Sequence, residues 1–107
     1  MGASQPDVAR NADTAVPEEG SIEALICSYD WDCGTALRIA ECESGMDPSA
    51  VGWTGESFGL FQLYAPVWAH VFPGFWELWA HAEWNTASAW TIYVRAGYSW
   101  APWDCRP

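Results

Sequence analysis

The sequence predicts one mainly α-helical (α+β) domain with a small central loop or β-hairpin, stabilised by disulfide bonds. Apolar residues recur at helical spacing in both halves of the chain, which predicts amphipathic helices. Three glycines within residues 51–59 indicate turns or a hairpin. Four cysteines in 107 residues favour two disulfides. We therefore expect a domain over residues 21–107, whereas the polar, acidic and proline-containing residues 1–20 are expected to form a disordered tail or linker.

Two helices are expected in the first half of this domain. Residues 21–29 begin with Ser21, which suits the N-cap position, and continue with apolar residues three and four apart. Residues 34–44 form the second predicted helix, which ends before Gly45 because glycine readily adopts the left-handed conformation that follows a helix.

The second half is expected to begin with a turn or hairpin and to end with a long helix. Residues 51–59 form the turn or hairpin, and residues 60–68 could begin a further helix. Asn85 is a good N-cap for a last helix that runs to about Arg95 and is ended by Gly97.

The charge of the chain argues against two classes of partner. Fourteen acidic residues against four arginines and no lysine give a net charge of −10. Nucleic acids and anionic lipids are bound by clustered basic residues, so neither is an expected partner. The sequence also has no apolar run of about 18 residues that would span a membrane and no signal peptide at its start.

The cysteines indicate the compartment. Cys27, Cys33, Cys42 and Cys105 do not form the two close pairs that are typical of zinc sites. An even number of cysteines in a short chain favours disulfides and therefore an oxidising, extracytoplasmic location. A secreted or cell-wall-associated protein is expected, with no metal or other cofactor.

Glu43 is the candidate catalytic residue. In a helix over residues 34–44, Ala36, Ile39, Ala40 and Glu43 share one face, so the carboxyl group lies at the end of an apolar stripe. Burial and the negative end of the helix dipole both raise the pKa of a carboxyl group there. A carboxylic acid that keeps its proton near neutral pH can protonate the leaving oxygen of a glycosidic bond. The alternative is an ordinary solvated glutamate at a helix end.

Sequence motifs around Glu43 resemble a known family. The segments Ala40-Glu41-Cys42-Glu43-Ser44-Gly45 and Gly59-Leu60-Phe61-Gln62-Leu63 resemble the catalytic stretch of soluble-type (SLT) lytic transglycosylases. Cys42-Glu43-Ser44-Gly45 together with Gly97-Tyr98-Ser99-Trp100-Ala101-Pro102-Trp103-Asp104-Cys105 is similar to resuscitation-promoting factor domains, although the second motif has one inserted position and Tyr98 in place of Trp. Asn85, Ala89 and Tyr93 match the pattern of the last helix of SLT-like domains. The resemblance covers about residues 22–106.

The resemblance implies a lysozyme-like fold and a function in cleaving peptidoglycan. Glu43 would be the general acid and then the base, and Ser44 would orient the carboxyl group or contact substrate. Gln62 would bind an acetamido group or hydroxyl of a sugar, the alternative being a solvated polar residue. Tyr93 would project towards Glu43, the alternative being core packing. The resemblance also implies a Cys42–Cys105 disulfide, which leaves Cys27–Cys33 as the second pair.

Several of the nine tryptophans are candidates for sugar binding, because an indole stacks on the apolar face of a sugar ring. Trp53 in the central loop and Trp68 after Gln62 are the expected groove residues. Three others, Trp90, Trp100 and Trp103, are expected in the core or over a disulfide. His70 and His81 have no spacing that suggests a metal site and are expected to be surface or structural residues.

The reaction depends on whether a second carboxylate is available. A retaining or inverting glycosidase needs two, and the sequence offers Asp47, for which a turn role is favoured, and Glu56, on a loop that could face the cleft. Without a convincing second carboxylate, the single-acid route of a lytic transglycosylase is favoured, giving 1,6-anhydroMurNAc ends. The alternatives are a hydrolytic muramidase that uses Glu56 or water, and a catalytically silent module that binds cell-wall glycan. The expected partner is the peptidoglycan glycan strand, bound by a monomer.

Overall fold

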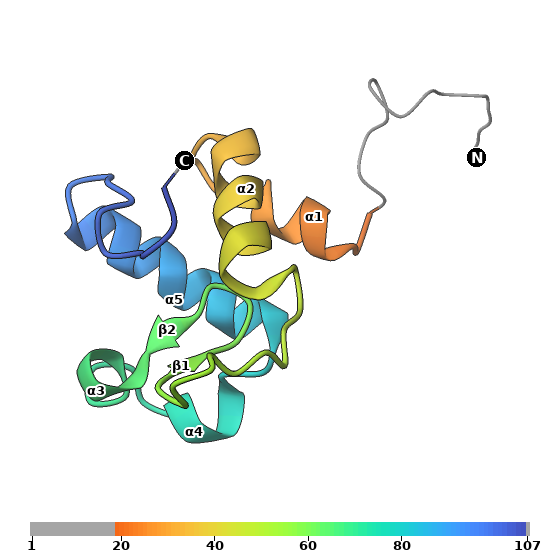
Figure 1. Ribbon diagram of the computed structural model, residues 1–107. Helices are drawn as coiled ribbons and strands as arrows, with labels where there is room; N and C mark the ends of the chain where they lie inside the picture. Colours follow the sequence, from red (N-terminus) through yellow and green to blue (C-terminus); the bar gives the residue numbers. More distant parts are fainter. Residues whose placement is uncertain (1–18, 107) are drawn as a thin grey trace, which may run out of the picture.

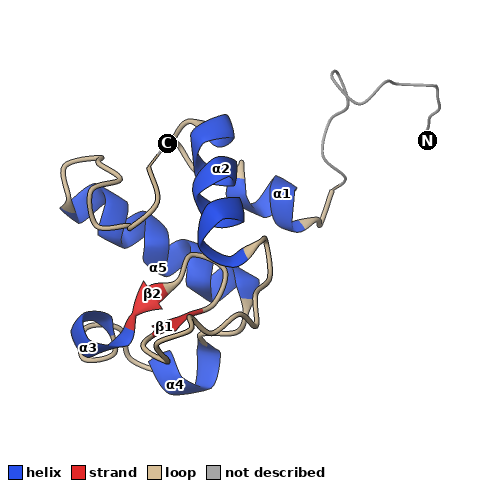
Figure 2. Ribbon diagram, in the orientation of Figure 1, coloured by secondary structure: helices blue, strands red, loops and turns tan. Residues whose placement is uncertain are grey.

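The computed structural model describes residues 19–106 (Figure 1). This part of the chain contains five helices and one two-stranded sheet, which confirms a mainly α fold with a small β element (Figure 2). In chain order the elements are α1 (Ile22–Ile26), α2 (Cys33–Ser44), β1 (Ser57–Phe58), β2 (Leu63–Tyr64), α3 (Ala65–Trp68), α4 (Phe75–Leu78) and α5 (Ala82–Arg95). The tail predicted over residues 1–20 lies outside the described residues except for its last two positions.

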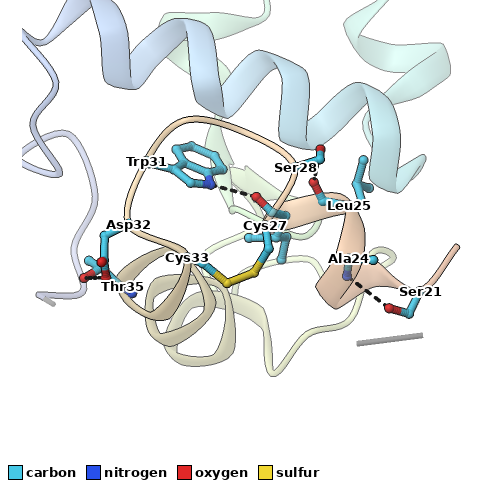
Figure 3. The surroundings of a disulfide bond; sticks show 10 residues. Ser21, Ala24, Leu25, Cys27, Ser28, Trp31, Asp32, Cys33 and Thr35 are labelled. Carbon is cyan, nitrogen blue, oxygen red and sulfur yellow. Dashed lines mark hydrogen bonds between the residues drawn. A yellow bond between two sulfur atoms is a disulfide. The ribbon is translucent and has the colours of Figure 1, made fainter. Parts of the chain in front are cut away.

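Helix α1 begins as predicted and ends three residues early. The Ser21 hydroxyl accepts the N–H of Ala24 at 3.0 Å, which is the expected N-cap. The helix ends at Ile26 because the chain turns there, and the carbonyl of Ile26 accepts the indole N–H of Trp31 at 2.7 Å. Figure 3 shows Trp31 lying over this turn, which the Cys27–Cys33 disulfide closes. The predicted continuation to residue 29 is therefore wrong.

Helix α2 carries the predicted apolar stripe. Its N-cap is Asp32, whose carboxylate accepts the N–H of Thr35 at 2.9 Å, so the helix starts at Cys33, one residue earlier than predicted (Figure 3). It ends at Ser44, before Gly45, whose φ of 65° is the left-handed conformation expected there. The stripe residues Ala36, Ile39 and Ala40 are fully buried, and Glu43 follows on the same face, half-buried.

A short hairpin occupies the middle of the chain. Strands β1 and β2 are antiparallel, with Ser57 opposite Tyr64 and Phe58 opposite Leu63. The helix predicted over residues 60–68 is wrong for its first five residues, and only α3 at its end is helical. Gly59, with a φ of 85°, and Gln62, with a φ of 50°, turn the chain between the strands instead.

Helix α5 begins earlier than predicted, because Asn85 is not its N-cap. The helix starts at Ala82, after His81, and the side chain of Asn85 is fully buried within it. Its amide oxygen accepts the N–H of Phe61 at 2.8 Å, and its amide nitrogen donates to the carbonyls of Phe58 and Trp79 at 3.1 and 3.0 Å. Asn85 thus stabilises the hairpin turn rather than its own helix.

An aromatic cluster centred on Trp31 joins the helices to the segment after α5. The ring centroid of Trp31 lies between 5.1 and 5.6 Å from those of five other rings. These rings belong to Tyr29, Phe61, Trp90, Tyr93 and Trp100. The indole N–H of Trp103, itself buried, donates to the carbonyl of Phe61 at 2.8 Å. The core prediction for Trp90, Trp100 and Trp103 is confirmed.

Both predicted disulfides are present, Cys27–Cys33 and Cys42–Cys105. The second joins α2 to the segment after α5, across 63 residues of chain. Figure 1 shows this segment returning along α5 towards α2.

The two disulfides are expected to contribute unequally to stability. Replacing Cys42 and Cys105 together by serine should lower the free energy of unfolding by about 4 kcal/mol, because a long loop is released in the unfolded chain. The matched Cys27→Ser, Cys33→Ser double variant releases a loop of only six residues and should lose about 2 kcal/mol. Urea unfolding of both variants measures the difference, and equal losses would contradict the prediction.

Asn85→Ala should lower the free energy of unfolding by roughly 3 kcal/mol, because it leaves buried backbone groups without partners. Thr91→Ala on the same helix removes only a single side-chain bond to the carbonyl of Ala87 and should stay within about 0.5 kcal/mol of the wild type. Urea unfolding compares the two. A loss at Asn85 no larger than that at Thr91 would show that the hairpin turn does not depend on Asn85.

Candidate active site

Two adjoining hollows meet at Glu43 and together form a groove. Their volumes are about 520 and 460 Å³. Both are lined by Glu43, Thr54, Ser57, Gln62 and Asp104. The larger hollow continues over β2, α3 and the 102–104 segment, and the smaller one continues towards the loop that carries Trp53. Glu43 therefore has groove on both sides of it.

The Glu43 carboxyl group is half-buried and hydrogen-bonded. Its Oε2 atom accepts the backbone N–H of Cys105 at 3.0 Å. Burial raises the pKa of Glu43, which is the largest effect, and the hydrogen bond from Cys105 opposes it. The nearby negative charge of Asp104 raises the pKa further, the backbone N–H of the same residue lowers it, and the net change is upward. The sequence predicted the effect of burial but not the hydrogen bond.

Covalent and hydrogen-bonded connections explain why residues 103–105 lie beside Glu43. Cys42 precedes Glu43 in α2 and is bonded to Cys105, so the two chain segments are adjacent here. Trp103, two residues earlier, is fixed by its hydrogen bond to Phe61. Asp104 lies between these two attachment points.

Gln62 lines both hollows together with Glu43, and both N–H groups of its side-chain amide are used in hydrogen bonds. Its Nε2 atom donates to the carbonyls of Ala50 and Gly59, each at 3.1 Å. Its Oε1 atom lies close over Gly52, where a Cβ atom would come within 2.9 Å of it. The group that Gln62 can offer to a ligand is therefore the acceptor Oε1.

Other predicted groove residues line one hollow each. Trp53 lines the smaller hollow and is 98% exposed, so its ring is free to contact a ligand. Trp68 lines the larger hollow, half-buried against Phe72, and Glu56 lies exposed at the rim of the same hollow. Ser44 lines the smaller hollow.

The hydroxyl of Ser44 and the carboxylate of Asp47 form hydrogen bonds at the C-terminal end of α2 and in the turn that follows it. The Ser44 hydroxyl donates to the carbonyl of Ala40 and accepts the N–H of Asp47. The carboxylate of Asp47 accepts the N–H and hydroxyl of Ser49, both at 2.9 Å, which lowers its pKa. The turn role predicted for Asp47 agrees with these bonds.

The structure does not bring Tyr93 together with Glu43. Tyr93 lines neither hollow, and its ring packs in the aromatic cluster, with the ring centroid of Trp100 4.7 Å away. The contacts of Tyr93 are those of the core alternative. Its spacing along α5 predicts a helix face but not what that face contacts.

Sequence reasoning missed Asp104 and the wall formed by Pro102 and Trp103. A signal was present, because a Cys42–Cys105 bond places Asp104 one residue from the partner of the residue before Glu43. Trp103 was expected only in the core, whereas it both packs there and lines the groove.

Two negative observations apply to residues 19–106. No group of three or more His, Cys, Asp and Glu side chains in this part of the chain could bind a metal ion. Over the same residues, no helix has the length and apolar character needed to cross a membrane. His70 and His81 are exposed, as expected for surface residues.

Replacing Glu43 by Gln should stabilise the fold by an amount that grows with pH. The pKa of Glu43 is higher in the folded protein than its ordinary value of 4.5, so this carboxyl group ionises more readily in the unfolded chain. The free energy of unfolding of the wild type therefore falls as the pH rises from 4.5 through the raised pKa. Glutamine does not ionise, so Glu43→Gln should have the larger free energy of unfolding at about pH 7 but not at about pH 3.

Urea unfolding at the two pH values measures this difference. Glu41→Gln, which removes one charge from the exposed face of the same helix, controls for the change in net charge. An advantage of Glu43→Gln that is the same at both pH values would mean that burial does not raise the pKa of this carboxyl group.

Comparisons of the chain with protein-family models, with curated proteins and with solved structures found no match. The motifs in the sequence therefore remain a resemblance. The function has to be inferred from the residues that the fold brings together at the groove.

Proposed function

We propose that this chain is a lysozyme-like domain that cleaves the β-1,4 bond between MurNAc and GlcNAc in peptidoglycan, acting as a lytic transglycosylase with Glu43 as its acid and base. One observation carries the proposal: a half-buried carboxyl group with a raised pKa lies where two hollows of the groove meet. The motif resemblance supplies the substrate class.

The surroundings of Glu43 suit a general acid. The carboxyl group ends the buried stripe of Ala36, Ile39 and Ala40, and the resulting loss of hydration favours its protonated form. Protonation of the leaving oxygen is the step that breaks a glycosidic bond, and it requires an acid that keeps its proton near the working pH.

The shape of the groove suits a polymer. Because hollows extend on both sides of Glu43, a glycan strand can lie across it with the bond to be cleaved at the carboxyl group. Trp53 on one side and Trp68 on the other offer rings on which sugars can stack. The Oε1 atom of Gln62 can accept the N–H of an acetamido group.

In the proposed reaction, Glu43 gives its proton to the glycosidic oxygen as the bond to the muramyl anomeric carbon breaks. The 2-acetamido group of the substrate stabilises the positive centre. Glu43, now ionised, takes the proton of the muramyl 6-hydroxyl, whose oxygen bonds to the anomeric carbon and gives the 1,6-anhydro sugar. Glutamate serves for both steps because the N–H of Cys105 stabilises its ionised form.

A hydrolytic muramidase is the second candidate, and one observation favours it. Glu56 lines the same hollow as Glu43, exposed at its rim, where a carboxylate could activate water. The third candidate is a module that binds cell-wall glycan without turnover. The two disulfides fit an oxidising, extracytoplasmic compartment, in agreement with a cell-wall substrate for any of the three.

Digestion of purified sacculi tests the proposal. The wild type should release muropeptides, and Glu43→Gln should lower the rate by about a thousandfold, because an amide cannot supply a proton. Glu41→Gln should digest like the wild type, because Glu41 lies on the exposed face of α2 and lines neither hollow.

Mass spectrometry of the products separates the three candidates. Transglycosylation gives muropeptides that are lighter by one water than hydrolysis products. Only hydrated reducing ends would replace the proposal by the muramidase. Sacculi that are bound but not digested would leave the binding module.

A further inference from the structure

We propose that Asp104, positioned beside Glu43 by the Cys42–Cys105 disulfide, assists the single-acid reaction of Glu43 electrostatically, because its negative charge stabilises the positive charge that develops on the glycan. This inference deepens the proposed function and rests on it. Neither Asp47 nor Glu56, the two candidates visible in the sequence, occupies an equivalent position.

The position of Asp104 is fixed from both sides. Before it, the indole of Trp103 is buried and donates to the carbonyl of Phe61 at 2.8 Å. After it, Cys105 is covalently bonded to α2, and its N–H donates to Glu43 at 3.0 Å. Because both neighbouring residues are anchored, the backbone of Asp104 is fixed beside Glu43.

Asp104 also faces the space that the substrate would occupy. It lines both hollows, as Glu43 does, although the two residues come from different elements. Asp47 is absent from both linings, and its carboxylate is bound by Ser49. Glu56 lines only the larger hollow.

No basic side chain among the described residues that line the hollows neutralises Asp104. Arg106, two residues away, donates to the carbonyl of Trp103 and lines neither hollow. On α2, Glu41 is exposed and also lines neither hollow. The charge of Asp104 raises the pKa of Glu43, whereas the backbone N–H of Asp104 lowers it, so the two residues lie close together.

This charge acts where glycosidic cleavage needs it. As Glu43 gives up its proton, the bonding electrons leave with the glycosidic oxygen and positive charge develops at the anomeric carbon. A fixed anion lowers the energy of that state more than the energy of the neutral substrate. Asp104 forms no bond in this step and transfers no proton.

Ligand binding tests the inference without turnover. The probes are chitotriose and a chitotriose whose terminal ring is a protonated piperidine, which carries the positive charge of the transition state. The wild type should prefer the cationic probe, and Asp104→Asn should reduce that preference about tenfold while leaving the affinity for chitotriose nearly unchanged. Glu41→Gln, an equal loss of charge outside the groove, should keep the preference.

A pH profile provides a second measurement that a structural role would not affect. In Asp104→Asn, the loss of the neighbouring charge should lower the pKa of Glu43, so the alkaline limb of kcat/KM should move to lower pH. The ¹³C resonance of the Glu43 carboxyl, assigned with Glu43→Gln, should titrate at lower pH in the same variant. Asp104 is exposed, so circular dichroism should find the variant folded.

The outcomes separate this inference from the proposed function. If the wild type binds the cationic probe no better than chitotriose, the role of Asp104 is overturned, whereas digestion of sacculi still decides the proposed function. If Asp104→Asn weakens both probes equally, or weakens neither, Asp104 does not stabilise the positive charge and the proposed function stands. A wild type that does not digest sacculi would overturn the proposed function and, with it, the role of Asp104 in cleavage, whatever the preference between the probes.

Discussion

The groove depends on the contact between the end of α2 and residues 103–105. Cys42 is bonded to Cys105, and the next residue, Glu43, accepts the N–H of the same cysteine. One covalent bond and one hydrogen bond thus join segments that are 63 residues apart. Without this contact, Glu43 would lose the wall of the groove that contains Pro102, Trp103 and Asp104.

The same contact places opposing influences on a single carboxyl group. Burial and the charge of Asp104 favour the protonated form of Glu43, whereas the backbone N–H groups of Cys105 and Asp104 favour the ionised form. Burial is the largest of these effects, so the pKa rises. A residue that must first give a proton and then accept one needs both states to be accessible, and fuller burial without the hydrogen bond would oppose the second.

The sequence predicted those parts of the fold that depend on interactions between neighbouring residues. The N-cap at Ser21, the end of α2 at Gly45 and the buried face of Ala36, Ile39 and Ala40 all follow from residues close in sequence. Glu43 was found for the same reason, because its position on that face depends only on helical periodicity.

Prediction failed where a side chain makes its main contacts with distant residues. Asparagine is common at N-caps, but the side chain of Asn85 bonds to a hairpin turn 24 residues earlier. These tertiary hydrogen bonds override the local preference. Tyr93 was placed by its spacing in α5, although the aromatic cluster around Trp31 decides its contacts. Asp104 has no signal in its neighbouring residues, since contacts of Trp103 and Cys105 with distant residues bring it to Glu43.

The far wall of the groove depends on residues 103–105 as well. Gln62 has a φ of 50°, a conformation that costs a non-glycine residue about 1 kcal/mol and persists only where neighbours determine it. The preceding residue, Phe61, is fixed at both backbone groups: its N–H donates to Asn85, and its carbonyl accepts the indole of Trp103. Trp103 therefore supports the backbone next to Gln62, while Cys105, two residues later, binds Glu43. Residues 103–105 therefore connect the end of α2 that carries Glu43 to the backbone beside Gln62.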